Sequence, residues 1–490
     1  MAETLTMLAF CAALFVSVGF GWPIIPALLI GVLLFSGYGL IRKVSLRSIA
    51  VHAASSIRAT STVLVTFVLI GLLTSLWRAS GTIAYIVTHA IAVIHPVTVL
   101  PLSFLLCSAM SVLTGSSFAS AATMGTVCMS FGLTMGASPV MLGGSILAGV
   151  YVGDRCSPVS TSALLVSQLT RTNLFDNLGR MVRTGAIPFV LSCLVYGAAA
   201  VVGARRGSQS DASHLAVATE RSASYGVPDI TMLFSASFHL HWLTVLPAVV
   251  VIVLALMRVD VRLIMIASIA VSTAICIGVQ GMGLMDLVDL LVFGYHASDP
   301  QIARLLDGGG MVSMLTVMAI VCISAAYSGI FAQTHMLDRL QHAISALAGH
   351  VGAVTATVVT AVGAAMLACN QTLAIMLTHQ LCTGLHRRDV AYGEGGRGDA
   401  GAGQIDGNAA VSAGDDDLTD ADERTHLALA IEDSAVVIAP LVPWAIAGAV
   451  PLATINAPTS SLLAAVFLYF VPLSRIIGEL ITRKTASVLA

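Results

Sequence analysis

Charged residues are scarce in this sequence. Lysine and arginine number 23 and aspartate and glutamate 25 among 490 residues, so only 10% of the chain is charged, whereas a soluble globular protein carries roughly 25%. Hydrophobic residues make up 57% of the chain, and the mean hydropathy is +0.93. A water-soluble fold of this length would lack polar surface, so the composition excludes that class and predicts a polytopic membrane protein.

Signatures of other protein classes are also missing from the sequence. The net charge is −2 and no basic face is present, so we expect no nucleic-acid partner. The nine cysteines form no CxxC pair, and the histidines form no HExxH motif. No serine, histidine or aspartate stands at the spacing of a known catalytic set. We therefore expect neither an enzyme nor a bound cofactor.

Long windows without Asp, Glu, Lys or Arg mark the membrane segments. A helix needs about 20 apolar residues to cross the hydrocarbon core, so these windows hold about 10–12 helical segments. They lack the alternation of β-barrel strands, which predicts an all-α fold. The windows are residues 4–41, 59–77, 79–153, 184–204, 230–257, 263–285, 308–337, 340–386 and 434–474.

Basic residues gather just after the first two predicted spans. They are Arg42, Lys43, Arg47 and Arg58. By the positive-inside rule this loop is cytoplasmic, which also places the amino terminus in the cytoplasm. The amino-terminal run lacks the basic flank and the cleavage site of a signal peptide, so we expect it to be retained as a span of the cytoplasmic membrane.

Two polar stretches interrupt the apolar windows. Residues 205–229 form a predicted linker. Residues 384–424 hold ten acidic and four basic residues and are rich in Gly, Ala and Asp, which predicts a disordered acidic loop. The two stretches separate a first transmembrane repeat (1–204) from the first part (230–383) and the last part (425–490) of a second repeat.

The two halves of the membrane part echo each other. The segment YVGDRCSPVSTSA corresponds to LAIEDSAVVIAPLVPWA, with Asp154 matched to Asp433, and Ser116 is matched to Gln371. Such weak internal symmetry, with polar interruptions at matching places, is typical of secondary transporters built from two inverted repeats. The echo alone also allows a chance similarity between two apolar sequences of low complexity.

Uncharged polar clusters lie at matching places in the two halves. Glycine and hydroxyl residues break a membrane helix and free backbone groups to face a ligand. The alternative is a seam of small residues where helices pack. The clusters are Thr114, Gly115, Ser116 and Ser117 in the first half and Asn370, Gln371 and Thr372 in the second.

Ionisable residues end two of the apolar runs. Carboxylate, hydroxyl and carbonyl oxygens are the ligands of hard cations, and a carboxylate inside a membrane can exchange a proton for a cation. Asp154 and Asp433 are therefore candidate Na+ ligands, although a structural Asp154–Arg155 pair and a helix cap at Glu432 are alternatives. The first set is Asp154, Arg155, Ser157, Pro158, Ser160 and Thr161, and the second is Glu432, Asp433 and Ser434.

The motifs that contain these residues resemble a known family. The stretches TGSSFASAATMG, GVYVGDRCSPVSTSALLVSQLTRTNLFDNLGRM and EDSAVVIAPLVPW are similar, in order and spacing, to those of NhaC-type sodium/proton antiporters, over residues 64–196 and 317–477. The resemblance implies two inverted repeats with re-entrant hairpins and an ion site between their polar tips. It carries over to Thr114, Gly115, Ser116, Asp154, Ser157, Pro158, Ser160, Gln371, Glu432, Asp433, Ser434, Pro443 and Trp444.

The sequence also departs from the family pattern. The family usually has Lys where Arg155 stands, Asp where Thr161 and Asn370 stand, and Asn where Ala445 stands. Two carboxylates and one amide expected at the ion site are therefore absent, which implies weaker sodium binding and fewer proton carriers.

Two transport functions remain open from the sequence. In a Na+/H+ antiporter, Asp433 or Asp154 would bind sodium and protons in turn. In a carrier of amino or carboxylic acids coupled to Na+ or H+, residues near Ser116 and Asn370 would hydrogen-bond the solute and Arg155 would face its carboxylate. Either protein works in a lipid bilayer, and the sequence leaves its oligomeric state open.

Overall fold

The computed structural model is helical throughout its described part. Apart from one isolated bridge between Tyr295 and Gly308, the described residues contain no β-structure. The predicted all-α, polytopic membrane architecture is confirmed, while the inverted relation of the two repeats and their re-entrant hairpins stay predictions. The structure describes residues 2–20, 22–59, 61–91, 94–210, 227–257, 259–334, 344, 348, 351–368, 370–383, 385 and 413–489.

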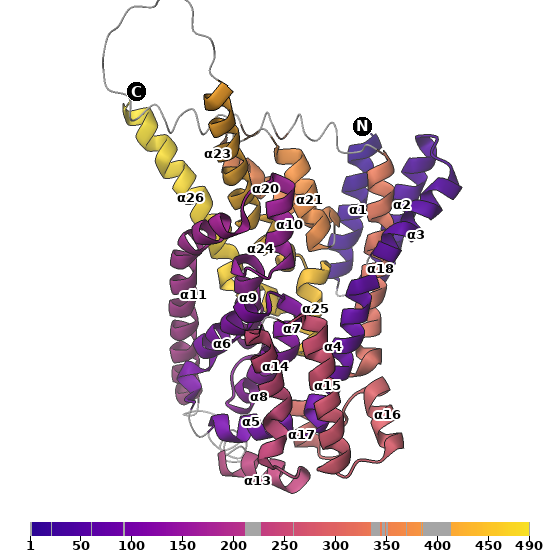
Figure 1. Ribbon diagram of the computed structural model, residues 1–490, viewed down its shortest axis with the longest axis vertical. Helices are drawn as coiled ribbons and strands as arrows, with labels where there is room; N and C mark the ends of the chain where they lie inside the picture. Colours follow the sequence, from indigo (N-terminus) through magenta and orange to yellow (C-terminus); the bar gives the residue numbers. More distant parts are fainter. Residues whose placement is uncertain are drawn as a thin grey trace, which may run out of the picture.

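One group of helices comes from the first part of each half of the chain. Helix α18 packs against α2, α3 and α4, α15 packs against α4 and α14, and α1 packs against α2. Several of these helices lie on the right of Figure 1. The group consists of α1 (Ala2–Gly19), α2 (Ile24–Ile41), α3 (Leu46–Ala59), α4 (Ser61–Ala79), α5 (Thr82–Ile91), α13 (Val227–Ser237), α14 (Leu246–Leu256), α15 (Val261–Gly278), α16 (Leu284–Phe293), α17 (Pro300–Leu306) and α18 (Gly310–Thr334).

A second group comes from the later part of each half. Helix α6 packs against α9, α11 against α26, and α20 against α21. Figure 1 shows α9 and α24 near the centre, with α11 and α26 on the left. The group consists of α6 (Val99–Thr114), α7 (Ser117–Ser120), η2 (Ala121–Gly125), α8 (Thr126–Thr134), α9 (Pro139–Cys156), α10 (Thr161–Thr170), α11 (Leu174–Ser210), α20 (Ala353–Ala368), α21 (Gln371–Cys382), α23 (Ala413–Glu432), α24 (Ala435–Ile438), η5 (Ala439–Leu441), α25 (Ile446–Thr454), η6 (Thr459–Ala464) and α26 (Val466–Leu489).

Several helices have the length and composition of membrane spans. A membrane offers no water to backbone amides and carbonyls, so continuous helices satisfy them internally. Outward-facing apolar side chains such as Leu33 and Ile187 are 72% and 69% exposed, as expected for a surface in contact with lipid. Within the described part of the chain, three helices are long and apolar enough to cross a bilayer, or up to five if each of two bent helix pairs is one span. The three are Ile24–Ile41, Pro96–Thr114 and Leu174–Gly203, and the bent pairs are Leu64–Ala79 with Thr82–His89 and Ala421–Leu441 with Ile446–Thr454.

The two polar stretches fall largely outside the described residues. Helix α11 continues through Ser210, and α13 begins at Val227, so the predicted linker at 205–229 is described only at its ends. Of the acidic stretch at 384–424, residues 413–424 form the start of α23. The prediction of a disordered acidic loop over residues 384–424 stays a prediction.

Close backbone contact between α6 and α9 depends on glycines. Gly149 and Gly153 lie four residues apart on the same face of α9. A Cβ atom on Gly149 would lie 2.6 Å from the carbonyl oxygen of Phe104, and one on Gly153 would overlap the backbone of Ser111. Small residues spaced four apart allow membrane helices to approach closely. This contact fixes the last turn of α9, which carries Asp154.

Candidate ion-binding site

The first polar cluster forms a break between α6 and α7. Gly115 ends α6 with φ +63°, and a Cβ atom there would lie 2.6 Å from the backbone carbon of Val159, so only glycine fits this left-handed position. Ser116 caps α7, with its hydroxyl accepting a hydrogen bond from the Ala119 amide. The Thr114 hydroxyl forms a hydrogen bond with the Ser120 hydroxyl at 2.8 Å, so both hydroxyls are bonded within the break.

The second polar cluster forms a matching break between α20 and α21. Asn370 caps α21, and its Oδ1 atom accepts a hydrogen bond from the Leu373 amide at 2.8 Å. Gln371 is the first residue of α21 and is partly buried, whereas Thr372 is exposed. Ser116 and Asn370 therefore act as helix caps at corresponding places, and both breaks follow the pattern predicted from the sequence.

Helix α9 ends where the sequence places its hydroxyl-rich motif. Ser157 donates a hydrogen bond to the Val112 carbonyl at 2.7 Å, and Ser160 caps α10 by accepting one from the Ala163 amide. The Ser160 hydroxyl also donates to the Asp154 carbonyl. Pro158 lies between the two serines and prevents a continuous helix. The serines thus shape the backbone around Asp154 instead of presenting their hydroxyls to an ion.

Asp154 is buried where the two breaks meet. Its Oδ2 atom accepts hydrogen bonds from Gln371 Nε2 at 2.9 Å and from the Ser162 hydroxyl at 3.2 Å, and the backbone of Ser117 lies against the same carboxylate. Gln371 Nε2 also donates to the Val436 carbonyl of α24 at 2.9 Å. These neighbours are neutral, so no cation in the described chain compensates the charge of Asp154.

Asp433 lies in a different electrostatic setting. Its Oδ1 atom accepts hydrogen bonds from Arg155, whose Nε lies at 3.0 Å, and from the Thr184 hydroxyl at 3.3 Å. Its Oδ2 atom forms an ion pair with Arg475 Nε at 3.0 Å. Arg155 therefore pairs with Asp433 of the other half of the chain, not with its neighbour Asp154.

Glu432 is the third buried acid of the site. It is 0% exposed, and neither of its carboxylate oxygens has a hydrogen-bond partner among the described residues. It lies within electrostatic range of Arg155, Asp433 and Asp154. The Ser434 hydroxyl donates a hydrogen bond to the Ala430 carbonyl at 2.5 Å. This hydroxyl is therefore bonded to the backbone at the end of α23 and not to the three acids.

The structure brings together only part of the predicted set. Asp154, Gln371 and the backbone of Ser117 meet, and Arg155 meets Asp433, whereas Thr161 and Thr372 are exposed. Sequence reasoning missed Thr184 and Arg475. The sequence does offer an indication of Arg475, because it is the first charged residue after the window 434–474. Nothing in the sequence distinguishes Thr184.

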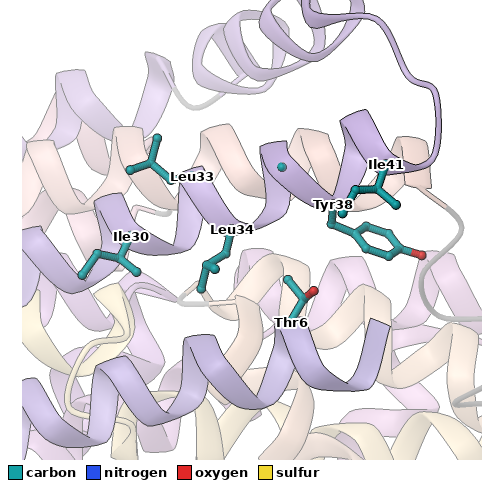
Figure 2. A pocket seen from close by; sticks show the side chains of 7 residues that line it. Thr6, Ile30, Leu33, Leu34, Tyr38 and Ile41 are labelled. Carbon is teal, nitrogen blue, oxygen red and sulfur yellow. The ribbon is translucent and has the colours of Figure 1, made fainter. Parts of the chain in front are cut away.

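The chemistry of this cluster suits a hard cation more than a transition metal. In the described part of the chain, no three His, Cys, Asp or Glu residues gather into a metal centre. The Asp154 carboxylate and the neighbouring Ser162 hydroxyl are oxygen groups of the kind that alkali and alkaline-earth cations prefer. A separate groove of about 360 Å³ lies between α1 and α2. It is apolar and contains no residue of this cluster. Figure 2 shows its lining residues Thr6, Ile30, Leu33, Leu34, Tyr38 and Ile41.

Comparison with known proteins decides the family. The profile of the Na+/H+ antiporter family matches residues 2–178 and 149–388. The chain belongs to this family. The matched residues include both polar breaks and the end of α9, so Asp154 and Gln371 lie within the family's part of the chain.

Curated relatives span most of the chain at low identity. The Na+/H+ antiporter NhaC of Alkalihalophilus pseudofirmus is 21% identical over 82% of this chain and 78% of its own length. The malate-2H+/Na+-lactate antiporter of Bacillus subtilis is 25% identical over 75% of this chain and 74% of its own. The arginine/ornithine antiporter ArcD of Halobacterium salinarum is 24% identical over 81% of this chain and 73% of its own.

Proposed function

We propose that the protein exchanges Na+ for H+ across the cytoplasmic membrane. The observation that carries this proposal is the balance of charge in the cluster around Asp154 and Asp433. Asp154, Glu432 and Asp433 supply three carboxyl groups, against the guanidinium groups of Arg155 and Arg475. With all five ionised, the cluster has a net charge of −1.

One monovalent cation would neutralise this cluster. A net charge is costly in the low dielectric of a membrane protein, so the cluster favours a state with one added cation. That cation can be a proton on a carboxyl group or a sodium ion beside it. A second cation would reverse the sign of the charge, so binding of Na+ and binding of H+ oppose each other, which is the requirement for exchange.

Asp154 is the carboxylate that we propose for sodium binding. Its neighbours, Gln371 and Ser162, are neutral hydrogen-bond donors that a bound cation can displace or share. Asp433, the other candidate from the sequence, already interacts with two guanidinium groups. A sodium ion at Asp433 would face two positive charges, so Asp433 fits the role of a fixed counter-ion better than that of an ion ligand.

Coupled transport of an organic solute is the second candidate function. Its support lies in two relatives whose names describe exchange of malate, lactate, arginine or ornithine. The group expected to face a solute carboxylate, Arg155, is instead bonded to Asp433 and Thr184. The contacts of Arg155 therefore favour cation exchange.

Transport by purified protein in proteoliposomes tests the proposal. With an imposed pH gradient, added Na+ should collapse the gradient for the wild type, and Asp154→Asn should abolish the effect. Asp289→Asn, on the exposed face of α16, is the matched control and should transport normally. If Na+ leaves the wild-type gradient intact, Na+/H+ exchange is excluded and solute screening follows. If Asp154→Asn transports normally, the choice of carboxylate is wrong.

A further inference from the structure

The amino-terminal end of α20 is capped by a residue from a distant helix. The first amides of a helix need acceptors, usually a Ser, Thr, Asp or Asn just before it. Here the preceding residue is Gly352, which has no side chain. Glu479 of α26 accepts hydrogen bonds from the amides of Val354 at 3.0 Å and Thr355 at 2.8 Å, and from the Thr355 hydroxyl at 2.6 Å.

The backbone at Gly352 is adapted to this contact. Gly352 has φ +105°, and a Cβ atom there would overlap the Glu479 carboxylate. A residue with a side chain would therefore be strained and would also displace Glu479. The negative carboxylate faces the positive end of the helix dipole, which strengthens the contact.

A series of contacts connects Glu479 on α26 to Asp154 and leads back to α26. Helix α20 is 16 residues long, so it extends about 24 Å from Glu479 to the break before α21. There Gln371 donates to both Asp154 and Val436. The series returns to α26 through Asp433, which pairs with Arg475.

One face of α26 therefore carries two residues, Arg475 and Glu479, that contact other helices of the site. Arg475 and Glu479 are four residues apart, so they lie on the same side of the helix. Arg475 reaches the end of α23, and Glu479 reaches the start of α20. Because α20 is a continuous helix, the contact at its start also bears on the position of its other end at Ala368, three residues before Gln371 of α21.

We propose that Glu479 is a positioning residue for ion exchange, which sets the depth of the α20–α21 hairpin so that Gln371 reaches Asp154. The proposal rests on the proposed function, since it assumes that Asp154 binds the ion. Glu479 itself touches no ion. Its effect should appear as a loss of apparent Na+ affinity, with the maximal rate preserved.

Kinetics in proteoliposomes provide the first test. Glu479→Ala should raise the KM for Na+ about tenfold or more with a maximal rate within about twofold, since a displacement on the order of 1 Å at a positioned group is costly. Glu479→Gln keeps one neutral acceptor and should raise the KM by only about threefold. Thr482→Ala, whose hydroxyl donates within its own helix to the Gly478 carbonyl, is the control and should behave as wild type. An unchanged KM in Glu479→Ala, or a fall in rate that merely follows a loss of folded protein, overturns the proposal.

Hydrogen exchange provides a test that does not depend on transport. In Glu479→Ala, amide exchange should rise in the first turn of α20 and also at residues 370–373, whereas Thr482→Ala should change neither. Faster exchange in the first turn alone would show that the contact does not reach the break, and the proposal would fail. If the wild type moves no protons in response to Na+, the proposed function fails, while the exchange data still decide whether Glu479 positions the hairpin.

Discussion

Asp433 binds two guanidinium groups from helices far apart in the chain. Arg155 of α9 donates hydrogen bonds to Asp433, Arg475 of α26 forms an ion pair with it, and the Thr184 hydroxyl of α11 is a further donor. Removing one member of a buried ion pair is costly because the other charge is left without compensation. Asp433 therefore has a structural role as the counter-ion of the buried Arg155 and the partly exposed Arg475.

Neutralising Asp433 should destabilise the protein. We expect Asp433→Asn to lower the free energy of unfolding by about 3–5 kcal/mol, because Arg155 and Arg475 lose their counter-ion. Thermal unfolding of the purified protein in detergent would measure this loss. Adding Arg155→Met should recover part of the stability, in a double-mutant cycle with strong coupling. Equal unfolding temperatures for the wild type and Asp433→Asn would contradict the assigned role.

The sequence predicted some residues of the site and missed others for physical reasons. Asp154 and Gln371 stood out because carboxylate and amide groups are rare inside apolar runs. The pairing of Arg155 with Asp433 could not be predicted, since it joins residues 278 positions apart. Local pattern contains no information on such a contact. Thr184 was missed because a lone threonine in a membrane helix is ordinary.

At the scale of elements, the breaks in the helices were the most predictable features. Gly115 is compatible with a left-handed backbone, Ser116 and Asn370 are good helix caps, and Pro158 ends α9. These properties are local, so the sequence reveals them. The start of α23 was not predicted, because a composition rich in Gly and Asp resembles that of a disordered segment.

The contact between α6 and α9 gives a prediction for Gly153. We expect Gly153→Ala to cost about 1–3 kcal/mol of stability, because the added methyl group overlaps the backbone of Ser111 and pushes α9 away. Gly197→Ala on α11 is the matched control, since nothing lies within 4 Å of its Cβ position. It should be neutral or slightly stabilising, as alanine favours a helix over glycine by about 0.5–1 kcal/mol. Unfolding temperatures would compare the two variants, and an equal response would argue against close α6–α9 contact.

At the scale of the whole molecule, each half of the chain contributes to both helix groups. The groups meet where α5 and α17 pack against α8, and where α4 and α18 pack against α25. The sequence predicted the membrane class, and the symmetry of the two halves stays a prediction. The sequence could not predict which helices pack together, because apolar helices in lipid look alike from composition and are sorted by small-residue contacts and buried polar pairs.

The orientation of the chain is open to a direct test. Arg42, Lys43 and Arg47 follow α2 closely, which favours a cytoplasmic position for the α2–α3 connection and the amino terminus. An epitope placed before Met1 should be protected from protease in right-side-out membrane vesicles and cleaved in inverted ones. Cleavage in right-side-out vesicles would reverse the proposed orientation.

The central claim is that one buried cluster accepts either a sodium ion or a proton. Calorimetric titration of the purified protein with Na+, repeated in buffers of different ionisation enthalpy, measures how many protons leave when sodium binds. From the balance of three carboxyl groups and two guanidinium groups, we predict release of one proton for each Na+ bound by the wild type, and no Na+ binding by Asp154→Asn. Sodium binding without proton release would contradict the account.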